Sequence, residues 1–138
     1  MFDSSQPSPL RVLLVDDSPR DRLLFECLAE DLQAEHQIDL DCHSAGSGLR
    51  ALEMLGSQRY DLMVLDQRMP EMSGSEVMAE LLRRYPSRAD RPRVLAYSSC
   101  DLPEFRRKCL DEGADSFRPK YMQTAELNAA LRELGLAQ

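Results

Sequence analysis

The chain has 138 residues, of which 43% are apolar and 30% are charged. This length fits one domain with one core, and the composition is too apolar for a disordered protein. The formal net charge of -7 argues against a nucleic-acid-binding protein, because such surfaces are rich in Lys and Arg.

Four cysteines are spread along the chain without a CxxC pair or a zinc-binding spacing: Cys27, Cys42, Cys100 and Cys109. We interpret them as reduced thiols. No apolar stretch reaches the length needed to span a membrane, and the first residues lack the apolar segment of a signal peptide. We therefore expect a cytoplasmic location and no membrane insertion.

Residues 1–9 are rich in Ser and Pro, and we predict a flexible N-terminal tail there. A single domain over 10–138 follows, in which strand-like and helix-like segments alternate. Three strand-like segments are short apolar runs, at 12–15, 62–65 and 94–97; a weaker segment with alternating polarity lies at 38–44, and a short final one lies at 117–120. Each precedes a segment that we predict to be helical, and four of these five segments have apolar residues at helical spacing.

Three of the helix starts carry capping signals. Ser18 followed by Pro19 predicts an N-cap with proline at the first helical position. Asp101 with Glu104 resembles a capping box for the fourth helix. Thr124 is expected to cap the last helix.

Five strand–helix units predict a doubly wound α/β fold. Strands separated by helices pair in parallel through right-handed crossovers, which gives an open sheet with helices on both faces. The weakest strand-like segments, 38–44 and 117–120, are expected at the edges. Pro119 supports an edge position for segment 117–120, because proline has no N–H to donate to a neighbouring strand and is therefore found mainly in edge strands.

Polar residues follow four of the five strand-like segments. Asp16 and Asp17 follow the first, Asp66 the third, Ser98 the fourth and Lys120 the fifth. Each alone has an ordinary explanation as a cap, a turn residue or a solvated charge. Ligands of open α/β sheets bind beyond the carboxyl ends of the strands, so the five residues together predict a site.

These residue types suit phosphoryl chemistry. Neighbouring carboxylates raise one another's pKa, and a hard divalent cation with oxygen ligands, Mg²⁺ above all, relieves their repulsion. Asp66 is then a candidate carboxylate nucleophile for a phosphoryl group. Lys120 would add a second positive contact, and the Ser98 hydroxyl would bind a phosphoryl oxygen.

Five segments of the chain resemble the receiver domains of bacterial two-component response regulators: VLLVDDSPRDR, SAGSGLRAL, YDLMVLDQRMPEMSG, RVLAYSS and GADSFRPK. The resemblance covers nearly the whole chain and implies a flavodoxin-like (βα)5 sheet with strand order 2-1-3-4-5. It also implies a single-domain regulator that takes a phosphoryl group from a histidine kinase or histidine phosphotransfer protein. Such a regulator then controls a downstream protein partner.

The resemblance assigns roles by position. Asp66 resembles the phosphoacceptor of the family. Asp16 and Asp17 resemble the acid pair that binds Mg²⁺ or Mn²⁺ together with Asp66, and the backbone carbonyl of Arg68 would be a further ligand. The Arg68 side chain is free to reach the phosphoryl group, reach a neighbouring acid or face solvent.

Ser98 and Lys120 match the phosphoryl-contacting hydroxyl and lysine of the family, and Phe117 matches its aromatic switch residue or is a plain core residue. The family usually has a cis-linked Pro directly after the lysine, where this chain has Tyr121. A cis bond before a residue other than Pro costs about 2.5–4 kcal/mol. We therefore expect a trans Lys120–Tyr121 bond, or a cis bond shifted to Arg118–Pro119.

Two other function classes compete with a phosphorylated switch. A phosphohydrolase of the haloacid-dehalogenase type places a second acid two residues after its nucleophile, where this chain has Arg68. A phosphorylation-independent protein-binding module on the same fold often lacks the acceptor or one of the acids, which this chain retains. We expect the chain to catalyse only its own phosphorylation and dephosphorylation.

Overall fold

A computed structural model describes residues 8–138, so the predicted tail lies outside the described residues except for its last two positions. The strands are β1 (Leu10–Val15), β2 (Leu40–Ala45), β3 (Leu62–Asp66), β4 (Arg93–Ser98) and β5 (Ser116–Pro119). The α-helices are α1 (Pro19–His36), α2 (Gly48–Ser57), α3 (Gly74–Arg84), α4 (Pro103–Asp111) and α5 (Thr124–Glu133). Between residues 8 and 138, no helix is both long and apolar enough to cross a membrane.

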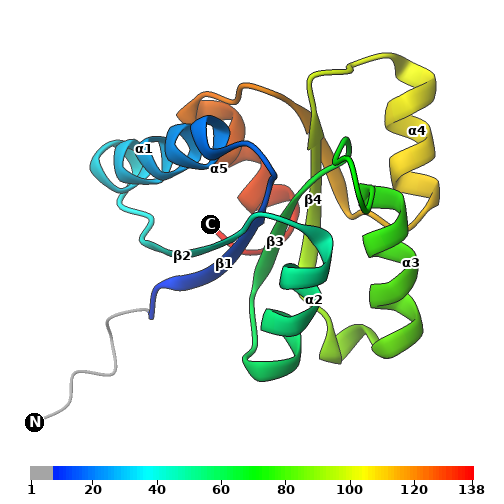
Figure 1. Ribbon diagram of the computed structural model, residues 1–138. Coiled ribbons are helices and arrows are strands. Elements are labelled where there is room, and N and C mark those ends of the chain that lie inside the picture. Colours follow the sequence, from blue (N-terminus) through cyan, green and yellow to red (C-terminus); the bar gives the residue numbers. More distant parts are fainter. Residues whose placement is uncertain (1–7) are drawn as a thin grey trace, which may run out of the picture.

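All four strand pairings are parallel, and the order is β2-β1-β3-β4-β5. The predicted fold class and strand order are confirmed, and the two weak strands lie at the edges. Figure 1 shows α1 and α5 on one face of the sheet and α2, α3 and α4 on the other. Because all the strands are parallel, their carboxyl ends lie at one edge of the layered sheet.

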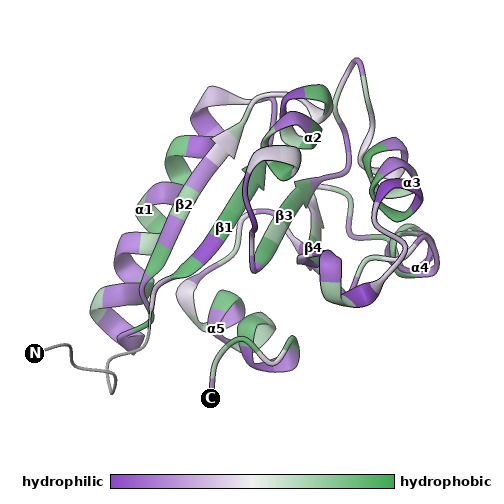
Figure 2. Ribbon diagram, turned by 90° about the horizontal axis from the view of Figure 1, so that it is seen from below, coloured by the Kyte–Doolittle hydropathy of each residue, from purple (hydrophilic) through white to green (hydrophobic). Residues whose placement is uncertain are grey.

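The core consists of two apolar layers, because successive residues of a strand point to opposite faces. Leu13 and Val15 belong to the layer under α2, α3 and α4, whereas Val12 and Leu14 belong to the layer under α1 and α5. The central strand β3 is buried along its whole length, and Figure 2 shows it mostly green, whereas the edge strand β2 is more hydrophilic. The two faces therefore account for the continuous apolar runs of the central strands.

The cap predictions were right once and wrong twice. Ser18 caps α1, and its hydroxyl accepts a hydrogen bond from the Asp21 N–H at 3.2 Å. The fourth helix begins at Pro103 with Leu102 as N-cap, because proline favours the first helical position; Asp101 lies outside. The last helix is capped at Gln123, whose N–H donates to Glu126, while the Thr124 hydroxyl donates to Glu35 of α1.

The start of α3 packs against the residue that follows β3. The Gly74 N–H donates to the Gln67 carbonyl at 3.2 Å, and the Gln67 amide donates to the Leu65 carbonyl at 3.0 Å. A Cβ at Gly74 would lie 2.6 Å from the Gln67 amide nitrogen and 2.8 Å from its Cα. Because Gly74 has no Cβ, the start of α3 can pack closely against Gln67, and this contact holds the loop after Asp66.

This close approach predicts opposite effects for two glycine substitutions. Gly74→Ala should lower the free energy of unfolding by roughly 1–3 kcal/mol, the range for forcing an extra carbon into a packed site. Gly56→Ala, in α2 with nothing within 4 Å of the added carbon, should raise it by up to about 1 kcal/mol. Urea unfolding followed by circular dichroism measures both, and equal effects would contradict the packing account.

Candidate functional site

The acids that the sequence analysis grouped do come together. Asp16 and Asp17 follow β1, and Asp66 ends β3, the neighbouring parallel strand. One carboxylate oxygen from each of the three residues lies within 4.8 Å of the others. Asp16 and Asp66 are buried, whereas Asp17 is exposed. The carboxyl ends of the two central strands thus form an acidic cluster that is open on one side.

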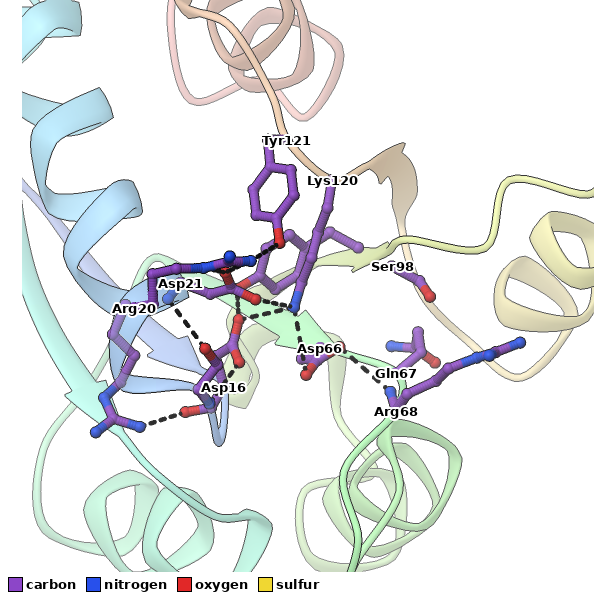
Figure 3. A network of polar contacts seen from close by, with 12 residues as sticks. Asp16, Arg20, Asp21, Asp66, Gln67, Arg68, Ser98, Lys120 and Tyr121 are labelled. Atoms are coloured by element: carbon purple, nitrogen blue, oxygen red, sulfur yellow. Dashed lines mark hydrogen bonds and ion pairs between the residues drawn. The ribbon is translucent and has the colours of Figure 1, made fainter.

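Lys120 reaches into this cluster from the end of β5. Its ammonium nitrogen lies 3.0 Å from Asp16 Oδ2, 2.9 Å from Asp21 Oδ2 and 3.6 Å from Asp66 Oδ2. Figure 3 shows these carboxylates arranged around the amine. Its side chain is 8% exposed, and its backbone N–H donates to the Ser98 carbonyl at 2.9 Å. One buried cation therefore compensates several buried acids.

Asp16 is oriented by contacts on both of its oxygens. The Ser18 N–H donates to Oδ1 at 2.9 Å, and the Tyr97 hydroxyl donates to Oδ2. The Arg22 guanidinium donates to the Asp16 backbone carbonyl at 2.7 Å. The carboxylate is thus held by the start of α1 and by Tyr97 of β4, the second strand along in the sheet.

Asp66 lies in an environment that disfavours its charge. Burial, with a smaller contribution from the charges of Asp16 and Asp17, raises the pKa of Asp66 to about 6 against the opposing charge of Lys120. The Arg68 N–H donates to Oδ1 at 3.2 Å and also opposes the rise. Any added positive charge at this rim would favour the ionised, nucleophilic form of Asp66.

Ser98 lies at the end of β4, next to the acidic strand end, and its side chain is fully buried. Its hydroxyl oxygen accepts the Cys100 N–H at 3.1 Å. A hydroxyl has one proton to donate besides its acceptor sites, so this bond leaves the O–H able to bind an oxygen anion.

Phe117 is buried on β5 and packs edge-to-face on Phe105 of α4, with ring centroids 6.2 Å apart. The Arg68 guanidinium lies 5.7 Å from the Phe105 ring centre and is exposed. In Figure 3 this side chain points away from the acids. The Arg68 side chain was expected to reach the phosphoryl group, reach a neighbouring acid or face solvent. It does not contact a neighbouring acid; it faces solvent beside Phe105.

The peptide-bond prediction was wrong, because Lys120–Tyr121 is cis. Each residue of the pair is held by its own contacts: Lys120 by the acids, Tyr121 by α1. The Arg20 guanidinium donates to the Tyr121 hydroxyl and lies 5.6 Å from the centre of its ring. Tyr121 thus replaces the family's proline with a side chain that bonds across the site.

Sequence reasoning missed three residues of this site: Asp21, Tyr97 and Arg20. Asp21 is buried, pairs with Lys120 and accepts from Arg20 at 3.3 Å. A signal for it was present, since a side chain in the first turn after the Ser18–Pro19 cap leans back toward the helix start. No comparable signal marks Tyr97, which reads as an ordinary strand residue.

Comparison with known proteins shows the family to which the chain belongs. The sequence model of the protein family described as response regulator receiver domain matches residues 12–132. The chain is 36% identical to the response regulator MprA of Mycobacterium ulcerans over 126 residues, 91% of this chain and 50% of MprA. It is 35% identical to the cyclic di-GMP phosphodiesterase response regulator RpfG of Xanthomonas campestris over 91% of this chain and 32% of RpfG. The chain thus spans about half of MprA and a third of RpfG.

Solved structures agree with the fold. The signal receiver domain of the response regulator NarL from Mycobacterium tuberculosis is 30% identical, with a TM-score of 0.74 over 96% of this chain and 100% of that one. The receiver domain of the sensor histidine kinase PA1611 from Pseudomonas aeruginosa is 24% identical, with a TM-score of 0.76 over 93% of this chain and 99% of that one. The family match, the curated relatives and the strand order together show that the chain belongs to the response regulator receiver domains of two-component signalling.

Proposed function

We propose that this receiver domain accepts a phosphoryl group on Asp66. A carboxylate oxygen of Asp66 would attack the phosphorus of a phosphohistidine, forming an O–P bond as the P–N bond breaks and its electron pair returns to the imidazole. The observation that carries the proposal is the burial of Asp66 between two further acids and the Lys120 ammonium.

The acidic cluster fits a hard divalent cation, Mg²⁺ or Mn²⁺. Three carboxylates whose oxygens lie within 4.8 Å offer the donors that such ions prefer, and the cost of keeping buried Asp66 charged would fall when one binds. Asp16, Asp17 and Asp66 would hold the ion, with the Arg68 backbone carbonyl as a further ligand. The PA1611 receiver domain is described with a magnesium ion in its active site cleft. The ion would neutralise charge on the transferring group.

The remaining site residues take the roles that the family implies. Lys120 would contact a phosphoryl oxygen, and the buried Ser98 hydroxyl would donate to another. Ser98 and Phe117 would form the switch, because a hydroxyl drawn toward the phosphoryl group makes room behind it for the ring. The packing of Phe117 on Phe105 would link that change to α4.

The proposed partners are a histidine kinase or histidine phosphotransfer protein upstream and a protein target downstream. The proposed chemistry is limited to phosphorylation and dephosphorylation of Asp66 itself. The cytoplasmic location stays a prediction.

Phosphorylation is testable by intact mass. The protein incubated with Mg²⁺ and acetyl phosphate should gain one phosphoryl group, and Asp66→Asn or a chelator should abolish the gain. Asp111→Asn, which removes an exposed carboxylate of α4, is the matched control and should behave as wild type. A folded wild-type protein that stays unmodified with Mg²⁺ bound, even with a kinase, would favour the phosphorylation-independent binding module.

Cation binding is testable without phosphorylation. Because an ion that binds only the folded state stabilises it, Mg²⁺ at 100 times its Kd should add about 2.7 kcal/mol, or roughly 5–10 °C in Tm. Asp17→Asn should weaken this shift, since it removes an exposed ligand with little loss of packing. Asp31→Asn, an exposed acid further along α1, serves as control. An undiminished shift in Asp17→Asn would place the ion elsewhere.

A further inference from the structure

Asp21 stands apart from the other acids near Lys120. It is in the first turn of α1, whereas Asp16, Asp17 and Asp66 stand at strand ends. Its Oδ2 makes the shortest of the three contacts to the Lys120 ammonium, at 2.9 Å. Among residues 8–138, the group of acids with oxygens close enough to share an ion is Asp16, Asp17 and Asp66, without Asp21.

The other two partners of Lys120 have competing tasks. Asp16 and Asp66 belong to the acidic cluster, so a cation bound there would draw their oxygens and their charge away from the ammonium. Phosphorylation would convert the Asp66 carboxylate into an acyl phosphate, so it would no longer be a free carboxylate partner of Lys120. Asp21 would then be the carboxylate that remains to hold Lys120.

Asp21 is itself held firmly. Its backbone N–H donates to the Ser18 hydroxyl at 3.2 Å, and Arg20 donates to its Oδ1 at 3.3 Å. Arg20 also binds Tyr121, the residue that follows Lys120 in the chain. Although burial raises it, the hydrogen bonds and charge of Lys120 bring the pKa of Asp21 below its ordinary value, so the carboxylate is ionised at neutral pH.

We propose that Asp21 is a positioning residue that keeps the Lys120 ammonium over the phosphoryl site while Asp16 and Asp66 are engaged. The proposal rests on the proposed function and adds to it a residue that acts through the lysine. Arg20 and Tyr121 support it by tying the start of α1 to the segment after β5 (Figure 3).

The chain suits a direct test, because Lys108 and Lys120 are its only lysines. With ¹⁵N-lysine labelling, ammonium spectra at low temperature contain two signals. The exposed Lys108 exchanges its protons quickly with water, while Lys120 is buried among carboxylates and should exchange slowly. In wild type the Lys120 signal should survive addition of Mg²⁺, since Asp21 still holds the amine.

In Asp21→Asn the Lys120 signal should be present without Mg²⁺ and broaden or vanish when Mg²⁺ is added. Asp31→Asn should match wild type, and Asp21→Glu, which keeps the charge, should retain the signal. An unchanged Lys120 signal in Asp21→Asn with Mg²⁺ would overturn the proposal, as would loss of the wild-type signal. Melting temperatures with and without Mg²⁺ separate either result from a failure to bind the cation or to fold.

A double-mutant cycle provides a second readout. Asp21→Asn should slow phosphorylation by acetyl phosphate at saturating Mg²⁺ by roughly 10-fold, because misplacing a reacting group by about 1 Å can cost on the order of 100-fold. In a Lys120→Ala background the same substitution should change the rate by less than about 2-fold. An equal factor in both backgrounds would mean that Asp21 acts through stability or general charge. A wild type that is phosphorylated neither by acetyl phosphate nor by a kinase would refute the proposed function and leave the spectra as the test of positioning.

Discussion

The burial of one lysine among three carboxylates is the interaction on which the site depends. Burial and the repulsion between the carboxylates at the ends of β1 and β3 together raise the pKa of Asp66 above its ordinary value. The Lys120 ammonium lies within 3.6 Å of Asp16, Asp21 and Asp66 and offsets that repulsion. Its own charge is favoured in return, because contacts with Asp21 and Asp16 outweigh the effect of burial and raise the pKa of Lys120. The cluster still holds more carboxylates than ammonium groups, and the proposed cation would offset that excess of negative charge.

The parallel sheet makes this arrangement possible. Parallel strands all end at one edge, so residues far apart in sequence meet there without a long loop. Tyr97 shows how closely the rim and the core are connected: its ring packs in the layer under α1 and α5, while its hydroxyl donates to Asp16. The loop after Asp66 is fixed in a similar way by Gln67 under the start of α3. The core thus places the reacting groups as well as stabilising the fold.

Tyr121 departs from the pattern of the family and also links two elements across the site. Tyr121 stands where the family usually has proline, and its hydroxyl is bound by Arg20 of α1. Arg20 in turn contacts Asp21, which holds Lys120. A proline could not make this bond, because it has no polar side chain. Tyr121 is therefore connected through Arg20 to Asp21. The resemblance to receiver domains assigned no role to either Arg20 or Asp21.

The sequence by itself determined the fold class, the strand order through resemblance, the edge strands and the set Asp16, Asp17, Asp66, Ser98 and Lys120 at one rim. These follow from local patterns: apolar runs of strand length, helical spacing, and polar residues directly after strands. Only the tertiary structure decided that Asp21 and Tyr97 join the site, that Arg68 turns to Phe105, and that Lys120–Tyr121 is cis. The contacts that bring Asp21 and Tyr97 into the site join residues far apart in the chain, 99 positions for Asp21 and Lys120 and 81 positions for Tyr97 and Asp16. Spacing along the chain does not indicate whether two such distant side chains will be in contact. Helix packing and side-chain direction decide that.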